Sequence, residues 1–256
     1  NDKAAESSLI PNASSYDLGS YSLLQYSKSK FETQIGLRYD IREIDAGDLL
    51  SKNFSKLNGS FGLVFQKGLY TLRTNFSSGF RPPHLSEMLS YGVHHGTNRF
   101  EIGSQDLKSE FANQFDISLD YGTEHINFNI NPFYNYFQNY IYVAPTADFI
   151  DGYQVYEYTQ ASSARTYGGE IYLHYHPHFA HRLHIENDFS YVIGEDNNNN
   201  PLPLIPQTRL NSNLKYEFAE TGKKFQLKTI LLQRTQFLDK NDVSTFETPS
   251  DSYEIY

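Results

Sequence analysis

Apolar and polar residues alternate with a period of two over many segments of the chain. In residues 111–121, Phe115 and Ile117 share one face of an extended backbone, while Gln114 and Asp116 share the other. The same alternation recurs in residues 31–42, 57–66, 126–131 and 209–218. This period is typical of β-strands with one apolar and one polar face. It predicts an all-β, antiparallel fold.

The connections between these segments alternate between short and long. Short connections are predicted near residues 27–30, 67–68, 122–124, 177–181 and 219–223, and long ones near 43–55, 79–110, 144–154, 194–206 and 238–248. The strands between them run about 10 residues, as tilted membrane strands do, rather than the ~5–6 of soluble sheets. Transmembrane β-barrels have short turns on one side of the membrane and long loops on the other. We therefore predict a transmembrane β-barrel, with residues 155–177 as one strand.

Composition agrees with a barrel but does not exclude a soluble sheet. The chain has 21 Tyr and 19 Phe, which suit strands and the aromatic girdles of barrels. It contains no run that approaches the ~20 apolar residues of a membrane-spanning helix. The mean hydropathy is −0.57, as expected when every second strand residue faces water. A soluble β-rich binding module, such as an adhesin or a carbohydrate-binding protein, remains the alternative.

Charge and motifs exclude several functional classes. The net charge of −9 argues against a nucleic-acid partner, which would need a basic surface. With no cysteine, the chain has no disulfide and no thiol nucleophile. It contains no G-x-S-x-G, H-E-x-x-H or phosphate-binding glycine loop, so we do not expect an enzyme. An outer-membrane protease or lipase with a catalytic dyad at the rim is left as a minor alternative.

Five sequence motifs occur in a consistent order along the chain. Residues 78–88 read SGFRPPHLSEM, and residues 36–40 read GLRYD. The others are YGGE at 167–170, LIPQTR at 204–209 and ETP at 247–249. Together they resemble the barrel of TonB-dependent outer-membrane receptors. The histidines look most like those of a histidine-rich, Bacteroidetes-type branch that is sometimes linked to zinc uptake.

The resemblance implies a receptor in the bacterial outer membrane. Barrels of this family have about 22 strands, of which we expect ten to eleven here. Residues 1–256 would form part of the barrel domain, without the family's plug domain, TonB box or signal peptide. The implied function is active uptake of a metal or metal chelate, such as an iron siderophore or zinc. Implied partners are TonB, acting through the plug, outer-membrane lipid and lipopolysaccharide, and the metal complex. No intrinsic cofactor is implied.

The longest predicted loop, residues 79–110, is the first candidate for contact with the substrate. Long ordered loops often carry function, and this one combines imidazole, carboxylate and aromatic groups. Its candidate residues are His84, Glu87, Tyr91, His94, His95, Arg99 and Glu101. The alternative is structural: His84 would brace the Pro82-Pro83 turn, and His95 would lie at a loop tip. We expect Arg81 to form an ion pair rather than to bind the ligand.

A second candidate site lies on the polar face of two later strands. Parity places His174 and His176 on one strand and His184 and Glu186 on the next. If the hairpin closes symmetrically, His174 lies opposite Glu186 and His176 opposite His184, with Cβ atoms ~4.5–5.5 Å apart. Imidazole and carboxylate groups at such distances can bind Zn²⁺ or a similar metal ion. The alternative is that these are polar lumen residues that contact a plug.

Overall fold

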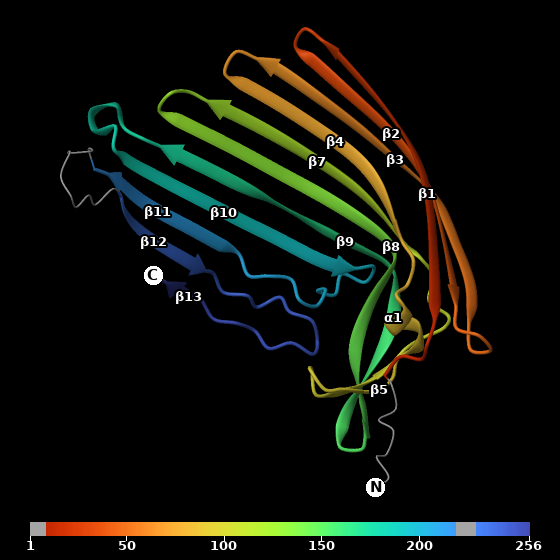
Figure 1. Cartoon of the computed structure of the whole chain (residues 1–256). Helices are drawn as coiled ribbons and strands as arrows, with labels where there is room; N and C mark the ends of the chain where they lie inside the picture. The colour runs from red at the N-terminus through yellow and green to blue at the C-terminus, as the bar shows by residue number, and fades with distance from the viewer. Residues whose placement is uncertain (1–8, 219–228) are drawn as a thin grey trace, which may run out of the picture.

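A computed structural model describes residues 9–218 and 229–256 of the chain. They form one 13-stranded sheet that curves as a single open layer (Figure 1). The strands are β1 (Ser14–Lys28), β2 (Phe31–Asp45), β3 (Ser51–Lys67), β4 (Tyr70–Arg81), β5 (Tyr91–His94), β6 (Arg99–Ile102), β7 (Glu110–Gly122), β8 (Ile126–Ile150), β9 (Tyr153–Tyr175), β10 (Leu183–Asp196), β11 (Arg209–Glu217), β12 (Thr229–Phe237) and β13 (Tyr253–Ile255). A short helix α1 (Leu85–Leu89) follows β4, and a 3-10 turn η1 (His178–Ala180) follows β9.

Sequential strands pair in an antiparallel meander. Eleven strands follow one another in the order β1-β2-β3-β4-β7-β8-β9-β10-β11-β12-β13. The β5–β6 hairpin lies off this path, and β6 pairs with β9 in parallel. The predicted all-β antiparallel architecture is confirmed, as is the expectation of ten to eleven strands along the main sheet. None of the helices within the described residues is long enough and apolar enough to cross a membrane.

Within the described residues, no second layer of protein covers the apolar rows of the strands. Leu57 is 60% exposed and Phe115 45%, although both lie within strands that are paired on both sides, and Phe31 at the start of β2 is 50% exposed. In a soluble sandwich these side chains would form the buried core between two sheets. An apolar face that is exposed over so many strands suits contact with lipid.

The asymmetry of the connections is confirmed in outline and corrected in two places. Tight turns lie at one end of the sheet, at the top left of Figure 1, and the longer connections at the other. The connection predicted at 43–55 shrinks to residues 46–50, because β2 and β3 both extend into it. The predicted short turn at 219–223 falls outside the described residues.

The prediction of a long loop at residues 144–154 is wrong. β8 continues to Ile150, and a two-residue turn at Asp151 and Gly152 leads directly into β9. Both turn residues have positive φ, 50° and 82°. Two-residue hairpin turns with positive φ at both positions favour the sequence Asp-Gly. Pro145 and the polar residues after it resemble a loop in sequence, and the pairing indeed shifts register between Pro145 and Phe149. The prediction of one continuous strand over 155–177 is confirmed by β9.

The hydrophobic core lies at the long-loop end rather than within the sheet. Its buried members come from the end of β2, the β2–β3 connection, α1, the segment before β7 and the far part of β8: Ile44, Ala46, Leu50, Met88, Leu89, Leu107 and Ile141. β7 pairs with β8 only as far as Gln138, and β10 pairs with β9 only as far as Ala164. The β8–β9 hairpin therefore projects beyond the main sheet. We call residues 82–109, together with this projection (139–163), the cap.

Candidate functional site

A network of charged groups fastens the start of the cap to the end of the sheet. Arg81 donates from Nη1 to both carboxylate oxygens of Glu87 at 2.9 Å, and its Nε pairs with Glu110. Glu110 is buried and accepts from the backbone N–H of Ile141 at 2.5 Å. The expected Arg81 ion pair is therefore present, with two carboxylates of the chain itself. This network positions α1 directly above the strand end.

His84 begins α1 as its N-cap. Its Nδ1 accepts from Ser86 N at 3.4 Å, and its own backbone N–H donates to Glu87 Oε2 at 2.7 Å. This reciprocal arrangement is a capping box, which satisfies N–H groups that a helix start leaves unpaired. The structure thus gives His84 and Glu87 structural roles. Their predicted contact with the substrate stays a prediction.

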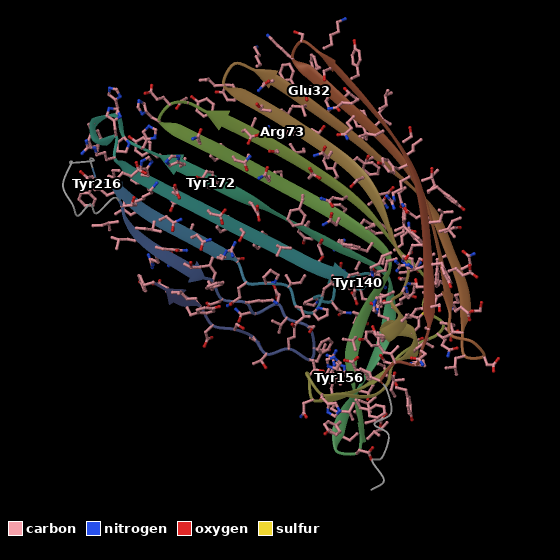
Figure 2. The ribbon with its side chains drawn as sticks, viewed as in Figure 1. Glu32, Arg73, Tyr140, Tyr156, Tyr172 and Tyr216 are labelled. Carbon is pink, nitrogen blue, oxygen red and sulfur yellow. The ribbon has the colours of Figure 1, made fainter. Side chains whose placement is uncertain are left out.

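The β5–β6 hairpin encloses a buried carboxylate. The Glu101 side chain is only 4% exposed, and it pairs with Arg99 at 2.7 Å and accepts from the Tyr158 hydroxyl at 3.1 Å. Arg99 also lies over the ring of Tyr156, 4.8 Å from its centroid. Burial, together with the nearby Glu101 charge, raises the pKa of Tyr158 to about 12. Figure 2 shows Tyr156 on the projection, far from the short turns.

The remaining predicted loop residues lie on the surface of the cap. Tyr91 is 66% exposed and packs edge-on against Phe100, with ring centroids 5.3 Å apart. His94 Nδ1 contacts Thr97 Oγ1 at 2.7 Å within the hairpin turn, and His95 is exposed beside it. Of the seven predicted loop residues, His84, Tyr91 and His95 are exposed and His94 is half-buried, and their contact with a substrate stays a prediction.

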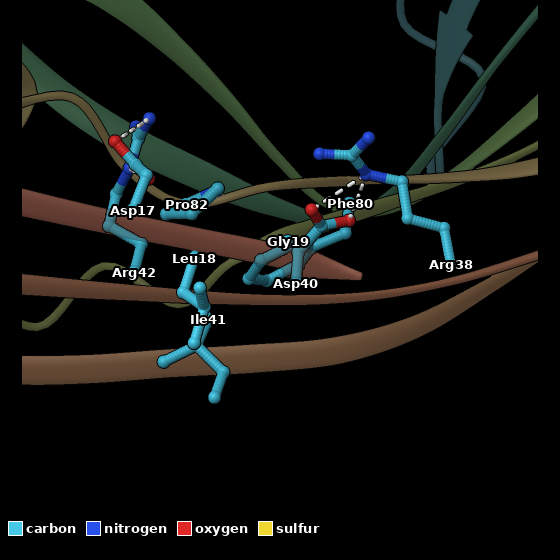
Figure 3. Close-up of a pocket in the computed structure, with 9 residues that line it drawn as sticks. All are labelled: Asp17, Leu18, Gly19, Arg38, Asp40, Ile41, Arg42, Phe80 and Pro82. Carbon is cyan, nitrogen blue, oxygen red and sulfur yellow. Dashed lines mark hydrogen bonds and ion pairs between the residues drawn. The ribbon is translucent and has the colours of Figure 1, made fainter. Parts of the chain in front are cut away.

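A pocket on the polar face of β1 and β2 was not singled out by the sequence (Figure 3). Arg42 pairs with Asp17 at 2.5 Å, and Arg38 pairs with Asp40 at 2.7 Å. A Cβ on Gly19 would lie 2.6 Å from Arg38 Nη2, so the glycine leaves room for these ion pairs. Arg38 and Asp40 belong to the GLRYD motif, whose charged residues therefore satisfy one another here.

Six of the nine histidines gather at the short-turn end of the polar face. They come from three places: the β7–β8 turn (His125), the end of β9 and the turn after it (His174, His176, His178 and His181), and the start of β10 (His184). We call these six residues the histidine cluster. In two groups of three, His174/His176/His184 and His125/His178/His181, the donor atoms all lie within 4.8 Å of one another.

The contacts within the cluster are almost entirely between imidazoles. His174 Nε2 lies 3.0 Å from His184 Nδ1, and His178 Nδ1 lies 3.1 Å from His125 Nε2. The rings of His125 and His176 join the two groups, with centroids 4.8 Å apart. Among the described residues, the carboxylate that forms an ion pair with a histidine of the cluster is that of Glu217, whose Oε2 lies 3.9 Å from His184 Nε2.

The predicted hairpin register is confirmed, but the predicted set of residues changes. His174 pairs with Glu186 across the β9–β10 ladder, as expected from symmetric closure. The Glu186 carboxylate does not belong to either group of close donor atoms in the described part of the chain. The prediction missed His125, His178 and His181. They lie in turns, where the alternation of strand residues does not predict which way a side chain points. The dense spacing of histidines from 174 to 184 was a signal for His178 and His181, whereas His125 is distant in sequence.

Two buried nitrogens of the cluster lack a hydrogen-bond partner within the described part of the chain. They are His125 Nδ1 and His176 Nδ1. Burial and the neighbouring histidines lower the pKa of His176, which favours its neutral form. Neutral imidazole is the form that binds metal ions. The cluster thus has the donor chemistry for metals such as Zn²⁺, Cu²⁺ or Ni²⁺.

Comparison with known proteins relates the whole chain to one family. A family model described as "TonB dependent receptor-like, beta-barrel" matches residues 2–256. Among solved structures, a copper transporter, OprC, is 16% identical with a TM-score of 0.78, covering 95% of this chain and 39% of that one.

Two further structures show the same fold. The FrpB iron transporter from Neisseria meningitidis is 16% identical, with a TM-score of 0.69, covering 96% of this chain and 38% of its own. The hemophore receptor HasR of Serratia marcescens, solved with its hemophore and heme, is 14% identical with a TM-score of 0.67, covering 90% and 47%. The chain therefore spans less than half the length of each structure.

Proposed function

The chain belongs to the TonB-dependent receptor β-barrel family of the Gram-negative outer membrane, and on that basis we propose that it forms part of an importer for a metal ion or metal chelate. The family consists of transporters and receptors rather than enzymes. Residues 1–256 would form part of a larger barrel domain. TonB would drive import by acting through a plug domain, and the apolar face of the sheet would contact lipid and lipopolysaccharide.

The observation that carries this proposal is the difference between the two faces of one uncovered sheet. One face exposes rows of Leu, Phe and Tyr, whereas the other carries paired charges such as Arg73 with Asp120 and Arg165 with Glu195. Figure 2 labels Arg73 on the sheet, towards its short-turn end. A charged face without a protein covering suits a water-filled passage, and an exposed apolar face suits the membrane.

Metal cargo is supported by residue chemistry and by the relatives. Tyr91 and His95 lie exposed on the cap and His94 lies half-buried beside them, where a ligand from outside the cell would arrive. Similar structures are named as transporters of copper and of iron. We therefore propose a metal or metal chelate as cargo, with zinc, iron siderophore, copper and heme as the candidates to compare.

Metal accumulation in cells tests this proposal. The receptor that contains this chain would be deleted and then restored from a plasmid, and cellular Fe, Zn and Cu would be measured by mass spectrometry at limiting supply. We expect at least one metal to fall several-fold on deletion, and to fall equally when TonB is removed. Unchanged accumulation of all three metals, supplied free, as siderophore complexes and as heme, would contradict metal import.

A further inference from the structure

We propose that the histidine cluster is a paired binding site for divalent metal ions of the zinc class, at the short-turn end of the polar face. One ion would be held by His174, His176 and His184, and the other by His125, His178 and His181. The inference deepens the proposed function and rests on it for one point, that the metal reaches this end by import. The binding itself stands on geometry alone.

The separations between donor atoms are close to those of a loaded site. Zn–N bonds of ~2.0–2.1 Å in a tetrahedral site place neighbouring ligand nitrogens about 3.3 Å apart. In each group one pair of nitrogens already lies near this separation, at 3.0 Å between His174 and His184 and at 3.1 Å between His125 and His178. The third histidine of each group has a donor atom within 4.8 Å of the others. To complete each set, the third donor atom has to move from this distance to about 3.3 Å from the other two.

The strands and turns hold these residues without help from a metal. His174 lies within the β8–β9–β10 ladder, between Asn127 and Glu186. The backbone N–H of His176 donates to the carbonyl of His125 at 3.0 Å, which ties the β7–β8 turn to the end of β9. Backbone pairing therefore brings imidazoles from three segments together, so part of the cost of organising the site is met by folding.

A cluster held together only by hydrogen bonds explains the arrangement less well. A contact between two imidazoles needs one N–H and one lone pair, and the two short contacts satisfy four ring nitrogens. His125 Nδ1 and His176 Nδ1 remain buried without partners. Buried polar groups are normally paired, and such exceptions call for an explanation. A metal ion that binds these rings, or reorients them, provides one.

The number of ligands indicates an exchangeable site rather than a structural one. Structural zinc sites are closed by four protein ligands, whereas three histidines leave a position for water or for an incoming ligand. Each group supplies three histidines and no carboxylate. Ring contact between His125 and His176 places the two groups side by side. This arrangement suits an ion that arrives from one side and leaves to the other.

Zinc titration of the purified, detergent-solubilised receptor tests the proposal. We expect the variant His174→Ala/His184→Ala to bind one Zn²⁺ fewer than the wild type in calorimetry, and His178→Ala/His181→Ala also one fewer. The matched control is Asn127→Ala, an exposed residue beside His174 on the same face; it should bind as many ions as the wild type. Equal stoichiometry in all four proteins would overturn the proposal.

X-ray absorption on the zinc-loaded wild type gives a test that needs no variant. We expect about three imidazole nitrogens per zinc ion. A first shell made of oxygen atoms alone would overturn the proposal even if the variants failed to fold. Metal uptake in cells separates this inference from the proposed function: import that persists with no zinc bound at the cluster rejects the site and keeps the transporter.

Discussion

The two ends of the sheet use the same residue type in different ways. The cap holds three histidines, His84, His94 and His95, and the histidine cluster holds the other six. In the cap, His84 and His94 bond to hydroxyl and backbone groups nearby in sequence, and buried apolar residues hold the structure together. In the cluster, the histidines contact one another, and no buried core lies among them in the described residues. Histidine content alone therefore does not distinguish the two ends, whereas the neighbours of each ring do, and they are the basis for the proposed metal site.

The largest effect should come from removing the buried carboxylate of the cap. Glu101→Ala leaves Arg99 and the Tyr158 hydroxyl without their partner in a nearly dry site. Breaking a buried pair in this way costs about 3–5 kcal/mol. We expect hydrogen exchange of the β5 and β6 amides to accelerate accordingly, with no change in the amides near the histidine cluster. Unaltered exchange in β5–β6 would show that packing alone holds the cap.

Replacing two adjacent leucines in turn tests whether burial, rather than hydrophobic character alone, sets the contribution of a side chain to stability. Leu50 is 7% exposed in the hydrophobic core that the β2–β3 connection shares with the cap, whereas Leu49 is 56% exposed. Leu50→Ala should destabilise the cap by about 2–5 kcal/mol because it leaves a cavity, and Leu49→Ala should change stability by less than about 0.5 kcal/mol. Protection of cap amides against exchange measures both. Similar losses in the two variants would contradict the assigned core.

Tyr158 makes the stability of the cap depend on pH at the alkaline end. Its folded pKa of about 12 is above the ordinary value of 10.0, so folding favours the protonated phenol. Its contribution is complete below pH ~10 and is lost as the pH rises towards ~12, since the unfolded state releases the proton first. Tyr158→Phe lacks the hydroxyl. We therefore expect the protection of its cap amides against hydrogen exchange to fall less steeply between pH ~10 and ~12 than in the wild type. An identical decline would assign the effect to other tyrosines.

The smallest effects on stability are expected from replacing single histidines, one at each end of the sheet. His84→Ala removes the N-cap residue of α1 and should lower the stability of this helix by about 0.5–2 kcal/mol. Faster amide exchange in α1 measures this loss. His178→Ala, at an exposed position, should change stability by less than about 0.5 kcal/mol without metal. A large loss on His178→Ala in metal-free buffer would mean that the cluster stabilises the fold by itself.

Local sequence signals predicted most of the sheet. Alternation in residues 111–121 correctly predicted β7, and symmetric closure about the turn after β9 correctly paired His174 with Glu186. Prediction failed where local signals conflicted. Pro145 and its polar neighbours resembled a loop, yet strand pairing continues to the turn at Asp151 and Gly152. The parallel pairing of β6 with β9 joins segments more than fifty residues apart, and no local sequence pattern predicts it.

The sequence by itself determined the strands, their two faces and the family, because side-chain period and turn chemistry act between near neighbours along the chain. Tertiary structure decided which polar residues meet. His125 joins His176, His178 and His181 only because β8 and β9 pair side by side, which brings the ends of both strands to one edge. In the same way, the buried Glu101 carboxylate accepts a hydrogen bond from the Tyr158 hydroxyl only because β6 pairs with β9. Contacts between distant segments depend on strand order and register, and these are set by the sheet as a whole.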